Sequence, residues 1–188
     1  MNSREEFPIK KICCLGAGYV GGPSMAVIAD KCPNLEVTVL DINKERINDW
    51  NNTNLDKLPV YEPGLKDVIR RVRGRNLFFS TEIESVIAGS QMVFISVNTP
   101  TKTKGFGAGY ASDLKWVEAS ARQVATYSRN HTIVVEKSTL PVKTAQVIKD
   151  ILKNSVDETT RKSDQNTFSI LSNPEFLAEC TAINDLNN

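Results

Sequence analysis

Two glutamates near the end of the chain, Glu175 and Glu179, have the i, i+4 spacing of side chains that share one face of a helix. They follow Asn173 and Pro174, which favour the N-cap and the first position of a helix. The apolar run 168–171 before them is typical of a strand. A carboxylate pair beyond the end of a strand can act as a general acid or base, although Glu175 could instead serve only to favour the helix dipole.

A second chemical signal is the glycine-rich motif at 16–21, which has the pattern GxGxxG between a predicted strand and a predicted helix. In that context Gly16 allows a tight turn, and Gly18 lets a diphosphate approach the backbone. Gly21 lets the helix and the strand pack closely, and the helix N-terminus favours the phosphate charge. The motif therefore predicts a dinucleotide site.

The identity of the dinucleotide depends on Asp41, which ends the second apolar run, 25 residues after Gly16. A carboxylate there accepts hydrogen bonds from both ribose hydroxyls and repels a 2′-phosphate, so the sequence predicts NAD rather than NADP. Arg46 lies about one helical turn further on and either contacts the adenosine or is a solvated helix residue.

Apolar runs alternate with amphipathic stretches along the whole chain, which predicts an α/β fold with a doubly wound parallel sheet of the Rossmann type. We expect about six strands with helices on both faces, in the order 3-2-1-4-5-6. Trp50, Trp116, Phe78 and Phe79 are interpreted as packing residues. The expected strands are 9–15, 36–41, 76–80, 92–97, 132–136 and one from Phe168, and the expected helices are 20–31, one through Ile47 and Trp50, 62–72, one from Thr81, 113–128 and 142–152.

Polar segments follow the last three strands at the carboxyl edge, where such sheets bind their ligands. Taken singly, each segment could be a cap or a turn, with Thr139 as an N-cap and Asn98 in a turn. Together they favour a site, because all three meet the edge that holds the glycine motif. They are Val97, Asn98, Thr99, Pro100 and Thr101 after the fourth strand, Ser138 and Thr139 after the fifth, and the glutamates after the sixth.

Composition excludes several other classes of protein. The 188 residues are 40% hydrophobic and 24% charged, which is typical of a globular protein. The net charge of +1 argues against a general nucleic-acid binder. No apolar run reaches the roughly 18 residues of a membrane span, and from the polar residues 1–6 we expect no signal peptide. A single histidine, His131, excludes a multi-histidine metal site. The four cysteines lack CxxC spacing, so we expect reduced thiols in a cytoplasmic protein. From the net charge and the short apolar runs, we expect neither nucleic-acid nor membrane partners.

Several segments together resemble the eukaryotic-type UDP-glucose 6-dehydrogenases of the UDP-glucose/GDP-mannose dehydrogenase family. The resemblance runs from about Ile9 to Leu186. It implies oxidation of UDP-glucose to UDP-glucuronate, with two NAD reduced and a thioester formed on an enzyme cysteine. The segments are 16–23 (GAGYVGGP), 58–65 (LPVYEPGL), 76–81 (NLFFST), 94–103 (FISVNTPTKT), 135–139 (VEKST) and 171–179 (LSNPEFLAE).

The same resemblance implies roles for single residues. Glu175 would be the acid or base in hydrolysis of the thioester, and Thr139 would help to hold the reacting water. The implied substrate-site residues are Glu175, Phe176, Leu177, Ala178 and Glu179. The implied NAD contacts are Gly16, Ala17, Gly18, Tyr19, Val20, Gly21, Asp41, Arg46, Val97, Asn98, Thr99, Pro100, Thr101, Ser138 and Glu179.

By the resemblance, residues 1–188 form the NAD-binding domain, whereas the catalytic cysteine, the central helix and the UDP-binding domain lie outside this chain. We therefore expect the chain to bind NAD without turning over UDP-glucose, and the full-length protein to form a homo-oligomer, a dimer or a hexamer. Cys180 stands where the family usually has glycine.

Two other interpretations remain open. A sister enzyme would oxidise UDP-N-acetylmannosamine or GDP-mannose with the same domain. Alternatively, the chain would be an inactive NAD-binding partner that docks on full-length subunits.

Overall fold

The chain folds around a six-stranded parallel sheet with the strand order β3-β2-β1-β4-β5-β6, as predicted. This computed structural model describes residues 9–105, 108–110, 112–137, 144–154, 167–174 and 180–186. The strands are β1 (Lys11–Leu15), β2 (Glu36–Leu40), β3 (Leu77–Ser80), β4 (Met92–Ile95), β5 (Thr132–Glu136) and β6 (Phe168–Ser172).

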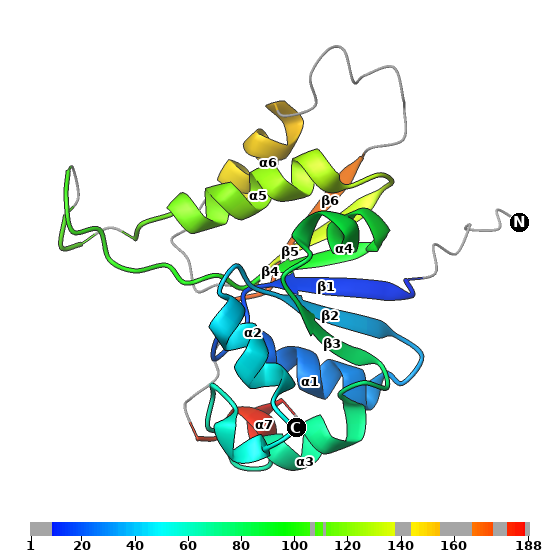
Figure 1. The fold of residues 1–188 in the computed structure, drawn as a ribbon. Helices are drawn as coiled ribbons and strands as arrows, with labels where there is room; N and C mark the ends of the chain where they lie inside the picture. The colour runs from blue at the N-terminus through cyan, green and yellow to red at the C-terminus, as the bar shows by residue number, and fades with distance from the viewer. Residues whose placement is uncertain are drawn as a thin grey trace, which may run out of the picture.

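Helices cover both faces of the sheet, which is what a parallel sheet requires because both of its faces are apolar. In Figure 1, α1, α2, α3 and α7 lie on one side of the strands and α4, α5 and α6 on the other. The helices are α1 (Gly21–Lys31), α2 (Lys44–Asn51), α3 (Leu65–Val72), α4 (Ile83–Gly89), α5 (Lys115–Tyr127), α6 (Thr144–Asn154) and α7 (Ala182–Asp185), with a short 3-10 helix at Leu55–Lys57.

Two apolar cores result, one on each face of the sheet. The adjacent residues Cys13 and Cys14 of β1 belong to different cores. Successive side chains of a strand point to opposite faces. Cys14 accordingly belongs to the core under α1 and α3, and Cys13 to the core under α5 and α6. β1 pairs with both β2 and β4, so the carboxyl ends of these three strands lie side by side.

The helix expected at 62–72 begins three residues later, at Leu65. Gly64 has a φ of 81°, which is left-handed and incompatible with a helical position, so the helix starts after it. Glu62 is left outside the helix, and its side chain is used elsewhere.

The interpretation of four aromatic residues as packing residues is correct for two of them. Trp50 and Phe79 are buried and stack at 4.6 Å between ring centroids. Trp116 and Phe78, however, are 43% and 40% exposed, so the prediction is wrong for these two. Phe78 belongs to an edge strand, on the face opposite to Phe79. Trp116 lies in the first turn of α5.

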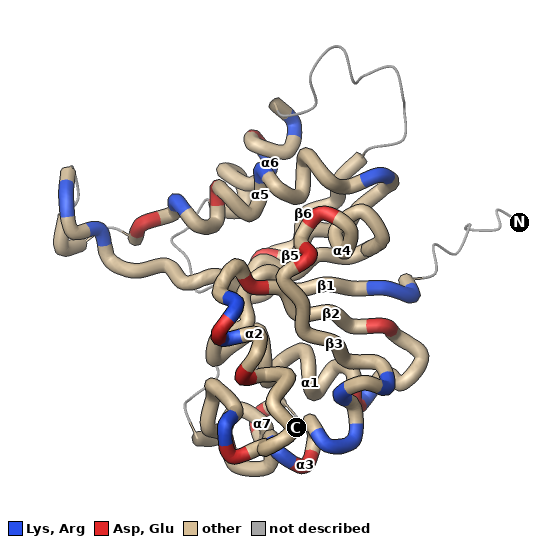
Figure 2. The backbone as a smooth tube through the Cα atoms, in the orientation of Figure 1, with Lys and Arg blue, Asp and Glu red and all other residues tan. Residues whose placement is uncertain are grey.

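Charged residues of both signs are spread over the whole molecule (Figure 2), with basic residues gathered near the end of α3. One of these, Arg71, forms a two-point ion pair with Asp30 of α1, at 3.0 and 2.6 Å. Among the described residues, no helix has both the length and the apolar character needed to cross a membrane.

Candidate functional site

The glycine motif forms a tight loop between β1 and α1. Gly16 has a φ of 109°, and its N–H donates to the carbonyl of Leu40 at 2.8 Å. A Cβ at Gly16 would lie 2.3 Å from the carbonyl oxygen of Ser96, and one at Gly21 would lie 2.0 Å from the carbonyl oxygen of Gly16. A Cβ at Gly18, by contrast, would meet no atom within 4 Å. The loop is therefore closed toward the sheet and open outward at Gly18.

Asp41 lies at the end of β2 directly beside this loop. Its Oδ2 accepts a hydrogen bond from the Ala17 N–H at 3.0 Å, and its Oδ1 accepts from the Asn43 N–H at 2.9 Å. Each carboxylate oxygen can accept a second hydrogen bond, so capacity for ribose hydroxyls remains. Arg46 approaches Oδ2 at 3.5 Å with a half-exposed side chain. Asp41 thus has a structural task in addition to the predicted one.

Two adjoining cavities open at the carboxyl edge of the sheet, on the two sides of Gly18. The first, of about 490 Å³, contains predicted residues from three segments. The second, of about 330 Å³, reaches past Asp41 toward α5. Gly18, Arg46, Ser96, Val97 and Asn98 line both of them. An elongated ligand could thus pass over Gly18 from one cavity to the other.

The structure brings together much of the predicted cofactor set. Ala17, Gly18, Tyr19, Val20, Arg46, Val97, Asn98 and Thr99 line the first cavity, and Gly16 and Asp41 line the second. Gly21 begins α1 just behind the loop. Pro100 and Thr101 lie further out. The Pro100 carbonyl accepts from the Asp113 N–H at 2.7 Å, and Thr101 pairs with Ser112 in an antiparallel bridge.

The second cavity also contains residues that the sequence did not point to, among them Ile42, Trp116 and Gln123. Ile42, which directly follows Asp41, is 67% exposed and presents an apolar side chain at this cavity. On α5, Val117, Ala121 and Val124 face the core, so Trp116, Ser120 and Gln123 form a neighbouring stripe toward the cavity. The spacing separates this stripe from the core face, but by itself it does not indicate which side of the core face meets a cavity.

Ser96 tests whether these cavities suit a polar ligand. Its hydroxyl is buried and has no hydrogen-bond partner among the described atoms, yet the residue lines both cavities. A buried unpaired hydroxyl is costly, and a ligand that bonds to it would remove that cost. Together with the open face of Gly18 and the carboxylate of Asp41, this fits a dinucleotide, whose diphosphate would lie at Gly18 and one of whose riboses would lie at Asp41.

The segments that follow the fifth and sixth strands are only partly included in the described residues. Glu136 ends β5 with a buried carboxylate whose Oε2 accepts from the Ser172 hydroxyl at 2.8 Å. Burial raises the pKa of Glu136, and the Ser172 hydrogen bond opposes that rise. The remaining predicted residues, Ser138, Thr139, Glu175, Phe176, Leu177, Ala178 and Glu179, lie outside the described residues, as does the expected helix after Pro174.

Tyr19, from the glycine loop, connects the first cavity to a buried carboxylate. Its hydroxyl donates a short hydrogen bond to Glu62 Oε2 and accepts one from the Cys180 N–H at 3.0 Å. Partial burial, followed by the hydrogen bond to Glu62, raises the pKa of Tyr19. The phenol therefore remains protonated near neutral pH and is available as a donor.

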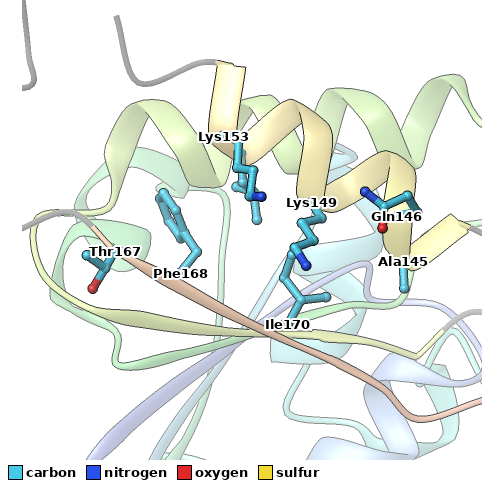
Figure 3. Close-up of a pocket in the computed structure, with 8 residues that line it drawn as sticks. Ala145, Gln146, Lys149, Lys153, Thr167, Phe168 and Ile170 are labelled. Carbon is cyan, nitrogen blue, oxygen red and sulfur yellow. The ribbon is translucent and has the colours of Figure 1, made fainter. Parts of the chain in front are cut away.

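A further cavity, of about 640 Å³, lies between α6 and β6 and shares no residue with the two described above. Figure 3 shows Phe168 and Ile170 of β6 facing Lys149 of α6 across it. It contains none of the predicted site residues, so we place the functional site at the glycine loop.

Comparisons with known proteins agree with this geometry. Residues 10–188 match the model of the NAD binding domain of the UDP-glucose/GDP-mannose dehydrogenase family. UDP-glucose 6-dehydrogenase 1 of Arabidopsis thaliana is 58% identical over 178 residues, which are 95% of this chain and 35% of the plant protein. UDP-glucose 6-dehydrogenase 2 of Oryza sativa subsp. japonica is 59% identical over 94% of this chain and 35% of its own length. This chain thus spans about a third of such relatives.

Solved structures have the same fold. A ternary complex of GDP-mannose dehydrogenase from Pseudomonas aeruginosa superposes with a TM-score of 0.76 at 28% identity, over 93% of this chain and 38% of that one. A UDP-glucose dehydrogenase from the archaeon Pyrobaculum islandicum gives a TM-score of 0.75 at 27% identity, over 98% of this chain and 40% of that one. The glycine loop, the carboxylate beside it and these matches lead to one conclusion: the chain belongs to the UDP-glucose/GDP-mannose dehydrogenase family, of which it contains the NAD-binding domain.

Proposed function

We propose that this chain supplies the NAD-binding half of a UDP-glucose 6-dehydrogenase, which oxidises UDP-glucose to UDP-glucuronate. The observation that carries the proposal is the double cavity around Gly18 and Asp41, in a chain 58% identical to a plant UDP-glucose 6-dehydrogenase. The sister activities on GDP-mannose or UDP-N-acetylmannosamine are less favoured, because the curated relatives that match at 58–59% identity are named UDP-glucose 6-dehydrogenases.

The described residues act on the cofactor by binding and orienting it. NAD, when bound, accepts the hydride from the sugar carbon. The loop amides beside Gly18 and the N-terminus of α1 favour the diphosphate. Asp41 accepts from a ribose and disfavours a 2′-phosphate, and Ser96 and Asn98 supply polar groups within the cavities. Ile42 and Trp116 offer apolar walls to the adenine.

Conversion of an alcohol to an acid takes two hydride transfers, between which a thiol can hold the aldehyde as a thiohemiacetal and then, after the second transfer, as a thioester. No described residue that lines the two cavities is a cysteine. Burial raises the pKa of Cys13 to about 12 and also raises that of Cys14, so neither is a nucleophile. We therefore assign the thiol to a segment outside this chain. Glu175 and Thr139 are assigned to the hydrolysis of the thioester, as base and as water ligand.

Cofactor binding is tested by titrating the purified chain with NAD and NADP in a calorimeter. We expect NAD to bind more tightly, and Asp41→Asn to weaken NAD binding by about 10- to 100-fold, the usual cost of losing a charged hydrogen-bond acceptor. Asp67→Asn, which removes an exposed carboxylate on α3, is the matched control and should bind like the parent chain. Equal affinities for NAD in all three proteins would contradict the assigned site.

The substrate is tested on the full-length protein, by following NADH formation with UDP-glucose, GDP-mannose and UDP-N-acetylmannosamine in turn. We expect two NADH per UDP-glucose and little reaction with the other two. The 188-residue chain alone should bind NAD without steady turnover, and sustained NADH production by it would refute the assignment of the thiol. If the full-length protein oxidises none of the three sugars, the inactive docking partner becomes the favoured function.

We further propose a cytoplasmic homo-oligomer. Four free thiols favour a reducing compartment. The segment after β4 projects from the domain (Figure 1), and its Tyr110 is 97% exposed, as expected for a side chain that becomes buried in an assembly. Native mass measurement of the full-length protein distinguishes a monomer, a dimer and a hexamer, and Tyr110→Ser should lower the assembly state if this segment forms an interface.

A further inference from the structure

Glu62 holds one of the few carboxylates buried in the described part of the molecule, and three donors converge on it. The residue is 4% exposed. Its Oε2 accepts from the Tyr19 hydroxyl and from the Cys180 N–H at 3.1 Å, while Oε1 accepts from the Ala182 N–H at 2.5 Å. These donors belong to segments that are about 160 residues apart in the chain, as the separation of 161 between Tyr19 and Cys180 indicates.

The first of these segments is the cofactor loop. Tyr19 lies between Gly18 and Val20, and all three line the cavity of about 490 Å³. Its hydroxyl reaches away to Glu62, so the rotamer of a side chain beside the cofactor is fixed by a carboxylate that does not itself line that cavity.

The second segment is 180–186, which directly follows Glu179. Glu62 accepts from the N–H groups of Cys180, just before α7, and of Ala182, its first residue, and α7 in turn packs by Ile183 into the core that α1 and α3 share. A Cβ placed on Gly64, two residues after Glu62, would lie 3.4 Å from the side chain of Ile183. The segment is thus docked by hydrogen bonds to Glu62 and by apolar contacts of Ile183 with the core under α1 and α3.

We propose that Glu62 is a positioning residue: through Tyr19 it couples occupancy of the cofactor cavity to the docking of segment 180–186. The inference rests on the proposed NAD binding. It goes beyond it because Glu62 touches neither cavity and is assigned no contact with NAD. Its role is to fix the position of the cofactor loop relative to segment 180–186, which directly follows the predicted catalytic glutamates.

Coupling of this kind is reciprocal. If a docked segment 180–186 fixes Tyr19 through Glu62, then NAD, by holding Tyr19, must stabilise the docked segment by the same factor. The amide protons of Cys180 and Ala182, which are bound to Glu62, report that stability through their exchange with solvent.

The decisive experiment measures hydrogen exchange at the Cys180 and Ala182 amides by NMR in the 188-residue chain, with and without saturating NAD. We expect NAD to slow both by about tenfold in the parent chain. Tyr19→Phe removes only the hydroxyl, and with it the bond to Glu62 and the bond from the Cys180 N–H, but it leaves the bonds from Glu62 to the segment, so it should fold normally and abolish most of this NAD effect. Equal slowing in Tyr19→Phe, or none in the parent chain, overturns the inference.

A second variant tests Glu62 itself. Glu62→Gln turns one acceptor oxygen into an NH₂ group, which must then face either the Cys180 or the Ala182 N–H, donor against donor. We expect exchange at both amides to accelerate at least tenfold without NAD, and NAD affinity to fall by about tenfold. Combining it with Tyr19→Phe should lower NAD affinity by less than the sum of the two single changes, because both disturb the bond between Tyr19 and Glu62.

The outcomes separate this inference from the proposed function. Asp67→Asn, on the neighbouring α3, is the control for removal of a carboxylate and should change neither exchange nor affinity. If the parent chain fails to bind NAD in calorimetry, the proposed function itself is wrong. If it binds NAD while Glu62→Gln binds equally well and exchanges at the parent rate, only the role of Glu62 is refuted.

Discussion

Cys180 adopts a backbone conformation that does not suit its side chain. Its φ is 69°, and no other non-glycine residue in the described part of the chain has a positive φ. In this region a Cβ approaches the following carbonyl oxygen, which costs about 1–2 kcal/mol. The conformation is maintained because the Cys180 N–H is held by both Tyr19 and Glu62. Glycine, which has no Cβ, would adopt this conformation without that cost, in agreement with what the resemblance implies for this position.

Cys180→Gly should therefore stabilise the fold. Relief of the strain outweighs the extra chain entropy of glycine, so we expect a gain of about 0.5–1 kcal/mol and a rise of about 2–4 °C in the midpoint of thermal unfolding followed by circular dichroism. Cys32→Gly is the control, because Cys32 is also an exposed cysteine but has a φ of −121°. An equal rise of the unfolding midpoint in both variants would show that loss of a thiol, and not relief of backbone strain, causes the effect.

At the scale of elements, the loop between β1 and α1 shows how one motif divides its glycines between folding and binding. Gly21 is pressed against the backbone of Gly16 and against Cys14 of β1, so its lack of a side chain serves the packing of α1 on the sheet. Gly18 faces open space and has no positive φ, so nothing within the protein itself requires glycine there.

Alanine substitutions should separate the two roles. Gly18→Ala is expected to keep the parent unfolding midpoint and to lose NAD affinity by at least about tenfold, since its Cβ occupies the approach of the diphosphate. Gly21→Ala should lower the free energy of unfolding by about 3 kcal/mol, because its Cβ meets backbone that cannot move aside. Denaturant unfolding and calorimetry on both variants check this. Loss of stability in Gly18→Ala would contradict the assignment.

The same elements indicate what the sequence could and could not predict. Alternating apolar runs predicted all six strands and their order, because a parallel sheet leaves few arrangements of βαβ units. The start of α3 was missed, although Pro63 and Gly64 are the central residues of a type II turn, in which the Leu65 N–H donates to the Glu62 carbonyl at 3.1 Å; this is a local signal that the sequence did contain. Trp116 was misassigned because the pattern of α5 alone does not indicate which neighbouring face meets a cavity. Asp41 was found, but its bond to Ala17 was not.

For the molecule as a whole, the two cores give two classes of thiol. Cys13 and Cys14 are fully buried between the sheet and its helices, whereas Cys32 and Cys180 are exposed. Burial raises the pKa of Cys13 to about 12, offset in small part by the Ser90 hydrogen bond, so this thiol stays protonated and unreactive while the fold persists.

Alkylation followed by intact mass should accordingly proceed in two phases. Cys32 and Cys180 should react rapidly. Cys13 and Cys14 should react slowly and at the same rate, because both become accessible only when the central strand opens in global unfolding. NAD at about 100 times its dissociation constant should slow the second phase by about 100-fold, since it stabilises the folded state by about 2.7 kcal/mol. If the buried thiols react at separate rates, or are unaffected by NAD, the two cores do not open as one unit.

The peptide at Ala17 has a consequence for the thermodynamics of binding. Its N–H is held by Asp41, and its carbonyl accepts from the indole of Trp50 at 2.9 Å, while the Trp50 ring fills the space next to Gly22. The conformational entropy of the loop is thus lost during folding, well before a ligand arrives. Association with a dinucleotide then needs little further ordering, and more of the contact energy remains as affinity. A core tryptophan that no ligand touches is in this sense part of the binding free energy.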